Sequence, residues 1–141
     1  MDLPPKLDAL MEELGLLPDP QERLALVVER AVRVPPLPPA GRTEANRVRG
    51  CISVVWIAPE LEGGRCRFHG DAESPLVRGL VVLLCEFFSG ATAGEIAATA
   101  LDPLEATGLS RQLSPTRRNG LASARATIVA WAARQAAEQA S

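Results

Sequence analysis

The residue of this chain best suited to chemistry is Cys51, in the stretch NRVRGCISVVW. It follows Gly50, and two arginines, Arg47 and Arg49, lie just upstream. Nearby guanidinium groups would favour the thiolate over the thiol, whose free pKa is about 8.5. A thiolate with access to a partner can attack sulfur without a general base, because sulfur is a good leaving group. A buried, inert cysteine at the start of a strand fits the same stretch, so these residues alone leave both interpretations open.

Three further side chains, Cys66, His69 and Cys85, could join a metal site or a catalytic triad. The spacing Cys66-x-x-His69 could hold zinc, but residues three apart on a strand point to opposite faces. Cys85 lies in a strongly apolar stretch, where a free cysteine usually fills the core. We therefore expect two buried cysteines, a surface histidine and no metal site. A hydrolase with Cys51 as nucleophile and His69 as base is an alternative.

An irregular, proline-rich segment is expected to deliver the chain to Cys51. The sequence VPPLPPAGRTEANRVRG carries four prolines, which remove backbone donors and disfavour a helix in the residues before them. We predict a connection that is extended and lies on the surface. Gly50, at its end, leaves room for the backbone of a partner to approach the cysteine.

The residues after Cys51 predict a β-hairpin. Residues 52–57 alternate as one strand, so that Ile52, Val54 and Trp56 share a face. The stretch PELEGG is expected to form the turn, and residues 65–69 alternate as the second strand. Because an isolated hairpin is marginally stable, helices must cover it.

Helices are predicted on both sides of the hairpin. A short helix near residues 3–14 precedes one that begins at Asp19-Pro20 with capping residues and an apolar stripe. Ser74-Pro75 begins a helix that is apolar nearly all round and should be buried at the centre. Capping patterns also begin a short helix at Thr92 and a long one at Ser114-Pro115. The fold class is α+β, a small antiparallel sheet packed against several α-helices.

Length, composition and charge limit the class of protein. With 47% hydrophobic and 23% charged residues, the chain predicts a single globular domain over residues 1–141. Its 15 Lys and Arg against 17 Asp and Glu give a net charge of -2, which offers no basic excess for nucleic acid. No signal peptide or membrane span is predicted, because the N-terminus is acidic and the longest apolar stretch is short. We expect a cytoplasmic protein whose three cysteines form no disulfide scaffold.

Four blocks of the chain match one known pattern in the same order. NRVRGCISVVW resembles N-x-V-x-G-C-x-S-x-V-W, and FHGDAESPLVRGL resembles a G-D-S-D-A-x-I-V-x-G-L block. SGATAGEI is similar to S-G-x-T-x-x-E-I, and GLSRQLSPTRRNGLASA to a closing L-S-P-S-R-x-N-G-L stretch. Together these blocks resemble the SufE family, sulfur acceptors that work with SufS-type cysteine desulfurases in iron–sulfur cluster assembly. The resemblance covers most of the chain and implies a SufE/IscU-like fold.

The resemblance implies a function for Cys51. This residue would take the terminal sulfur of a persulfide on the desulfurase, stimulate that enzyme, and pass the sulfur to a scaffold such as the SufBCD complex. Family members hold the cysteine in a hydrophobic pocket, which protects it from oxidation until its loop swings out toward the partner. No metal or organic cofactor is implied, only a transient persulfide on Cys51. The chain would act as a persulfide acceptor and desulfurase activator rather than as a free-standing enzyme.

The matched positions also suggest partner-binding residues. Arg117, in the S-P-x-R stretch, is implied in the partner contact, and Arg49 and Asp71 are further candidates. The structural alternatives are a solvated charge for Arg117, a turn or cap residue for Asp71, and close packing for Gly120. Because Lys6 is the only lysine, docking contacts would depend on arginines, which pair well with carboxylates.

The chain departs from the family pattern at three positions. Ile52 and Val54 stand where many members carry glutamine, and Glu73 replaces an aspartate. These differences leave the nucleophile in place but bear on the identity of the desulfurase. One alternative is a CsdE-like protein that serves a CsdA-type desulfurase. An alternative of another class is a metal-binding or Fe–S scaffold in the manner of IscU.

Overall fold

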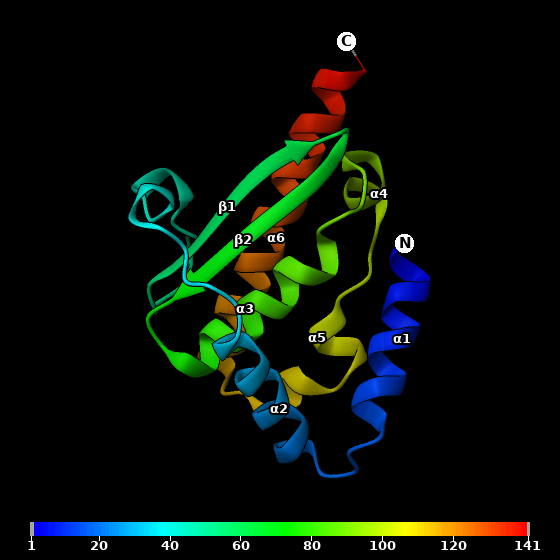
Figure 1. Ribbon diagram of the computed structural model, residues 1–141, viewed down its shortest axis with the longest axis vertical. Coiled ribbons are helices and arrows are strands. Elements are labelled where there is room, and N and C mark those ends of the chain that lie inside the picture. Colours follow the sequence, from blue (N-terminus) through cyan, green and yellow to red (C-terminus); the bar gives the residue numbers. More distant parts are fainter. Residues whose placement is uncertain (1, 141) are drawn as a thin grey trace.

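The computed structural model describes residues 2–140 and shows helices packed around a β-hairpin (Figure 1). This is the α+β fold expected from the sequence, with a two-stranded antiparallel sheet. In chain order the elements are α1 (Leu3–Gly15), α2 (Pro20–Val32), the 3₁₀ turns η1 (Pro39–Gly41) and η2 (Glu44–Asn46), β1 (Val55–Glu62), β2 (Arg65–Ala72), α3 (Pro75–Phe88), α4 (Ala93–Ala98), α5 (Pro103–Ala106), η3 (Leu109–Gln112) and α6 (Pro115–Gln139).

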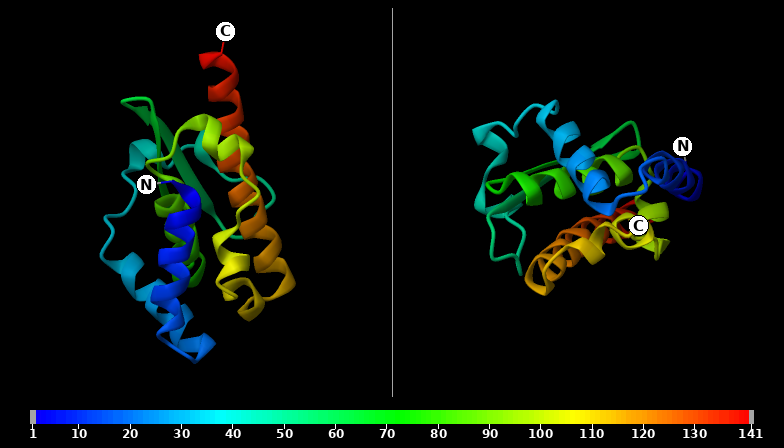
Figure 2. Two further views of the ribbon diagram at one scale, coloured as in Figure 1. Left: turned by 90° about the vertical axis from the view of Figure 1, so that its right-hand side faces the viewer. Right: turned by 90° about the horizontal axis from the view of Figure 1, so that it is seen from below.

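Helix α3 is the centre of the molecule. It packs against β2, and it lies between α2 on one side and α6 on the other (Figure 2). Nine of its fourteen residues are buried, because its sequence is apolar on almost every face. Ser74 caps its first turn by accepting a hydrogen bond from the Val77 N–H group. The prediction of a buried central helix is confirmed.

The predicted helix starts are confirmed where a local cap marks them. Asp19 accepts a hydrogen bond from the Gln21 N–H group at the start of α2. Thr92 and Glu95 form the reciprocal capping box of α4. After the hairpin, α5 and η3 were not predicted, since each is only four residues long and carries no apolar period.

The hairpin is longer than predicted and begins later. The strand predicted over residues 52–57 begins only at Val55, and PELEGG is not a turn, because Pro59 to Glu62 continue β1. Pro59 is tolerated there because it pairs with Phe68, whose backbone groups bond to Ser89 on the far side of β2. The ladder therefore needs no N–H group from the proline.

The turn and the faces of the hairpin follow from this register. Only Gly63 and Gly64 form the turn, both with positive φ. Val55 and Ile57 share the face that meets the core, as the alternation predicted. Ile52 and Val54 precede β1, so the face that they were predicted to share with Trp56 is wrong. The predicted inward side of β2 is confirmed, since Cys66 and Phe68 are buried.

The proline-rich segment before Cys51 loops out beside the sheet, as Figure 1 shows in cyan. It is not simply extended, because η1 and η2 interrupt it. Pro39 is the first residue of η1, where a missing N–H group costs nothing. The segment then joins the edge of β1: Arg47 bridges to Trp56, and the Val48 N–H group donates to the Val55 carbonyl at 2.9 Å.

One buried carboxylate, that of Asp71 in β2, holds this segment in place. Its Oδ2 accepts hydrogen bonds from the Leu37 N–H group at 3.0 Å and from Arg42 at 2.8 Å, and its Oδ1 accepts one from Arg78 of α3 at 2.8 Å. Arg78 also donates to the carbonyls of Ala31 and Val34. The network thus joins the end of α2, the proline-rich segment, β2 and α3.

Burial raises the pKa of Asp71, but the hydrogen bonds from two backbone N–H groups and two guanidinium groups outweigh it and hold the pKa below its ordinary value of 3.8. A pKa that is lower in the folded state stabilises the fold above the unfolded value. That contribution is lost as the pH falls through the folded pKa.

Among the described residues, no helix is long and apolar enough to cross a bilayer.

Asp71→Asn is expected to lower the free energy of unfolding by about 3 kcal/mol at pH 7, because it leaves Arg78 without its buried counter-charge. Urea unfolding measures this loss. Glu29→Gln, which removes an exposed pair with Arg33, is the control and should change stability by less than about 0.5 kcal/mol. Between pH 5 and pH 2 the wild type should lose stability more steeply than Asp71→Asn. Equal slopes would contradict the assignment.

Candidate functional site

Cys51 lies on an irregular loop between Val48 and β1 and rests on the first turns of α6. Its S–H group donates a hydrogen bond to the Gly120 carbonyl, with an Sγ–O distance of 3.1 Å. A Cβ atom at Gly120 would lie only 2.9 Å from this Sγ. The thiol is therefore seated on a part of the helix that has no side chain.

A second close approach holds the residue before it. Gly50 has φ +85°, a conformation that side chains rarely adopt, and a Cβ atom there would lie 2.6 Å from Ser123 Oγ. Gly120 and Ser123 are three residues apart and so share one face of α6. The sequence suggested that Gly50 opens space for a partner, but in the structure that space faces Ser123 of the same chain.

The space beside the thiol is small, with a volume of about 20 Å³. It is enclosed by the cysteine loop, by α3 and by the start of α6, and its lining residues are Cys51, Ile52, Ser53, Val77, Thr116, Arg117, Gly120 and Leu121. Ile52 closes one side yet is 83% exposed, which is unusual for a large aliphatic side chain. The half-buried thiol thus lies beside an apolar surface residue.

Burial raises the pKa of the Cys51 thiol above its ordinary value, and the positive charge of Arg47 offsets this only in part. Arg47 thus favours the thiolate, as expected, but its effect is smaller than that of burial. Arg49 points to Glu44, with which it forms an exposed ion pair at 2.8 Å. In its observed position Cys51 is a protonated thiol at neutral pH.

The candidate partner-binding residues fall in different environments. Arg117 is exposed and lines the space beside Cys51, so the structure brings these two residues together. Arg49 is exposed two residues before the cysteine. Asp71 is not at this surface: only 4% of its side chain is exposed, and both oxygens are occupied by the network described above. Its carboxylate therefore has a structural role and does not reach a partner in this conformation.

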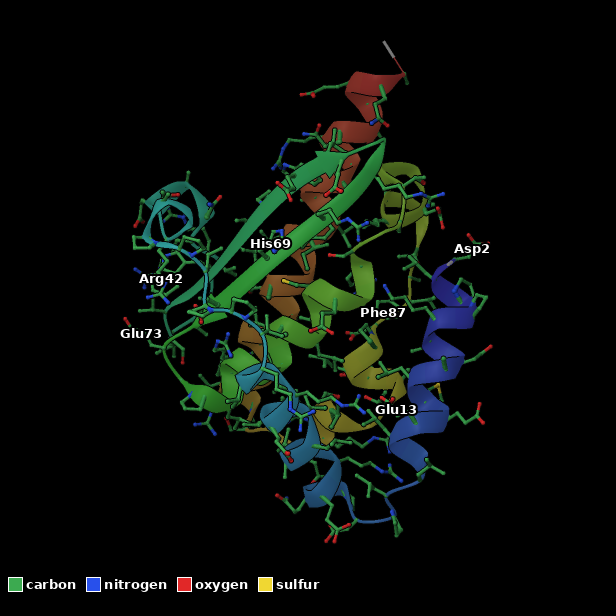
Figure 3. All side chains as sticks on the ribbon, viewed as in Figure 1. Asp2, Glu13, Arg42, His69, Glu73 and Phe87 are labelled. Atoms are coloured by element: carbon green, nitrogen blue, oxygen red, sulfur yellow. The ribbon has the colours of Figure 1, made fainter. Side chains whose placement is uncertain are left out.

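The other soft ligands do not converge on Cys51. Cys66 and Cys85 are buried, as expected from the sequence. His69 lies on the hairpin (Figure 3), is exposed, and contacts Glu60 on the neighbouring strand at 3.2 Å. It does not line the space beside Cys51, so the geometry gives no support to a hydrolase with His69 as base. Within residues 2–140, no three His, Cys, Asp or Glu side chains are grouped so as to hold a metal ion.

Two residues of the site were not predicted from the sequence. They are Ser123, which with Gly120 forms the seat of the cysteine loop on α6, and Val77 of α3. Gly120 was noted only for close packing, which the structure confirms. A signal for the seat exists in the spacing Gly120-x-x-Ser123, which puts two small residues on one helix face. No signal in the sequence links that face to Cys51, because the hydrogen bond between Cys51 and Gly120 spans 69 positions of the chain.

Comparisons with known proteins agree with this fold and indicate one family. The model of the SufE family, described as an Fe-S metabolism associated domain, matches residues 8–132. A SufE-like protein of Synechocystis sp. is 38% identical over 118 residues, which cover 84% of this chain and 74% of that protein. A chloroplastic/mitochondrial SufE-like protein of Arabidopsis thaliana is 31% identical over 85% of this chain and 33% of its own length.

A solved structure shows the same architecture. The solution structure of a hypothetical protein from Thermus thermophilus matches with a TM-score of 0.75 and 27% identity, over 92% of this chain and 95% of the other. The chain belongs to the SufE family. It has a role in Fe–S metabolism, with a partner in Fe–S assembly such as a cysteine desulfurase.

We expect iodoacetamide to modify the folded protein once, at Cys51, at a rate that rises with pH through a midpoint above that of a free cysteine. The rise reports the thiolate, whose formation burial opposes. Mass spectrometry of peptides locates the modification. Cys66 and Cys85 are internal controls, since both are buried, and their modification before Cys51 would contradict the assignment.

Proposed function

We propose that this chain is a sulfur acceptor that takes sulfur from a SufS-type cysteine desulfurase onto Cys51, stimulates that enzyme, and hands the sulfur to a scaffold of the SufBCD type. The supporting observation is the placement of Cys51. It is the only one of the three cysteines that lies on an irregular loop at the surface, whereas Cys66 and Cys85 are core residues. Membership of the SufE family supports the same role.

The transfer needs only thiol chemistry. The thiolate of Cys51 attacks the outer sulfur of the donor persulfide, and a new S–S bond forms on Cys51. The S–S bond of the donor breaks, and the donor cysteine leaves as a thiolate that takes up a proton. The outer sulfur keeps its oxidation state, so the step needs no oxidant, reductant, metal or organic cofactor.

The resting position of Cys51 is unsuited to this attack, which implies a movement. The S–H group is donated to the Gly120 carbonyl, and burial disfavours the thiolate. The loop around it, residues 49–54, has no regular secondary structure and can move without breaking a strand or helix. We propose that docking of the donor draws this loop outward, where nearby arginines can stabilise the thiolate.

The surface around Cys51 suits a donor with an apolar contact and acidic groups at its rim. Ile52 is exposed beside the thiol, and Arg49 and Arg117 flank it. Guanidinium groups pair with carboxylates in a planar, two-bond geometry. We propose that the exchange takes place in the cytoplasm, a reducing compartment that suits three free thiols.

Incubation with a persulfide-loaded cysteine desulfurase is expected to add about 32 Da, the mass of one sulfur, to the intact chain. Peptide mapping should place the sulfur on Cys51. Cys51→Ser should gain no mass, while Cys66→Ser, in a folded protein, should gain as much as the wild type. Sulfur on Cys66 or Cys85 instead, or none in the wild type, would refute the proposal.

Ile52→Asp is expected to raise the KM for the donor about tenfold, equivalent to about 1.4 kcal/mol, because it replaces an apolar contact with a charge that repels an acidic rim. The transfer rate at saturating donor should change little. Val32→Asp makes the same change at a residue that is 77% exposed on α2 and outside the loop. An equal effect of both substitutions would show that Ile52 makes no specific contact.

A further inference from the structure

The stability of the helix does not explain why residue 120 is a glycine. It lies in the second turn of the 25-residue α6, and glycine inside a helix is less stable than alanine. Its φ angle is not positive, so the backbone does not require glycine. The three nearest atoms that a Cβ there would meet outside its own helix turn all belong to Cys51: Sγ at 2.9 Å, and Cα and Cβ at 3.9 Å each. The absence of a side chain at residue 120 therefore makes room for the Cys51 thiol.

The contact is one of two that hold the loop closed. One helical turn further along α6, Ser123 faces Gly50, where a Cβ atom would lie 2.6 Å from the serine oxygen. The loop dipeptide Gly50-Cys51 thus packs on two small residues of one helix face. A larger side chain at either helix position would displace the loop.

The seat on α6 also favours the protonated thiol over the thiolate. The Gly120 carbonyl oxygen accepts the S–H proton at 3.1 Å, whereas a thiolate would have no proton to donate and would face a partial negative charge. Of the charged groups nearby, Arg47 favours the thiolate and Arg117 of α6 lines the cavity, while α3 contributes only the apolar Val77. The closed seat therefore holds a proton on Cys51 despite these arginines.

We infer that Gly120 is a positioning residue that keeps Cys51 closed and unreactive until a sulfur donor opens the loop. This inference rests on the proposed function, because it assigns to Gly120 the regulation of the acceptor thiol. In the absence of a donor, the seat limits the reaction of Cys51 with other electrophiles and oxidants. Opening of the loop is the step that a donor must supply.

The test is the rate of iodoacetamide labelling of Cys51 from about pH 6.5 to about pH 9.5, a range that brackets the free thiol pKa, without any donor. Gly120→Ala should increase the rate at about pH 7.5 roughly tenfold and move the midpoint of the pH profile down, because the added methyl group displaces the thiol into solvent. Ser123→Leu should act in the same direction by displacing Gly50. Gly94→Ala, a glycine of α4 with nothing within 4 Å, is the matched control and should behave as the wild type.

The pH profile of Cys51 labelling distinguishes a positioning role of Gly120 from a merely structural one. An unchanged rate and midpoint in Gly120→Ala, with Cys66 and Cys85 still protected, would overturn the inference. Labelling of Cys66 and Cys85 in the same variant would overturn it too, since Gly120 would then support the core and not only the thiol. The experiment uses no desulfurase, so its failure is distinct from a failure of persulfide transfer to the wild type, which would refute the proposed function alone.

Discussion

The carboxylate of Asp71 joins the proline-rich segment to β2, to α3 and, through Arg78, to the end of α2. It accepts hydrogen bonds from the backbone at Leu37 and from the guanidinium groups of Arg42 and Arg78, and Arg78 extends the network to the end of α2. Arg42 also lies over the Trp56 ring, 5.4 Å from its centre. A buried charge is tolerated only when it is paired and hydrogen-bonded, and here both oxygens are occupied. The hydrogen bonds within the proline-rich segment are local to its 3₁₀ turns, and this network ties the segment to β2 and α3.

That network sets the starting point of the cysteine loop. The fixed segment ends at the bridge between Arg47 and Trp56, and β1 begins at Val55. Between these two anchors the loop is irregular, and its middle rests on α6, where the Cys51 thiol donates to the Gly120 carbonyl and Gly50 approaches the Ser123 side chain. The site therefore combines rigid ends with a weakly held centre, which is the arrangement expected of a loop that moves as a unit. Asp71 supports the site through this anchoring, since its carboxylate is buried and both of its oxygens are occupied.

The sequence predicted those features that depend on neighbouring residues. Caps such as Ser74 and Thr92 marked helix starts correctly, because their partners lie within three residues. The strand start was wrong because apolar alternation continues through Ile52 and Val54, which belong to the loop. Ile52 is apolar at the surface, so a pattern rule took it for part of the strand. The role of Asp71 was beyond such rules, since its side-chain partners and Leu37 lie between seven and 34 residues away.

The sequence and the structure indicate different charge states for Cys51. Two arginines beside a cysteine indicate a stabilised thiolate, and the structure instead holds a thiol whose proton is donated to Gly120. In this resting position burial outweighs the charge of Arg47. Once Sγ leaves this seat, the cost of burial and the carbonyl dipole are both removed, whereas Arg47 stays at the anchored start of the loop. A single change of loop position would thereby convert a protected thiol into a nucleophile, and no additional base would be needed.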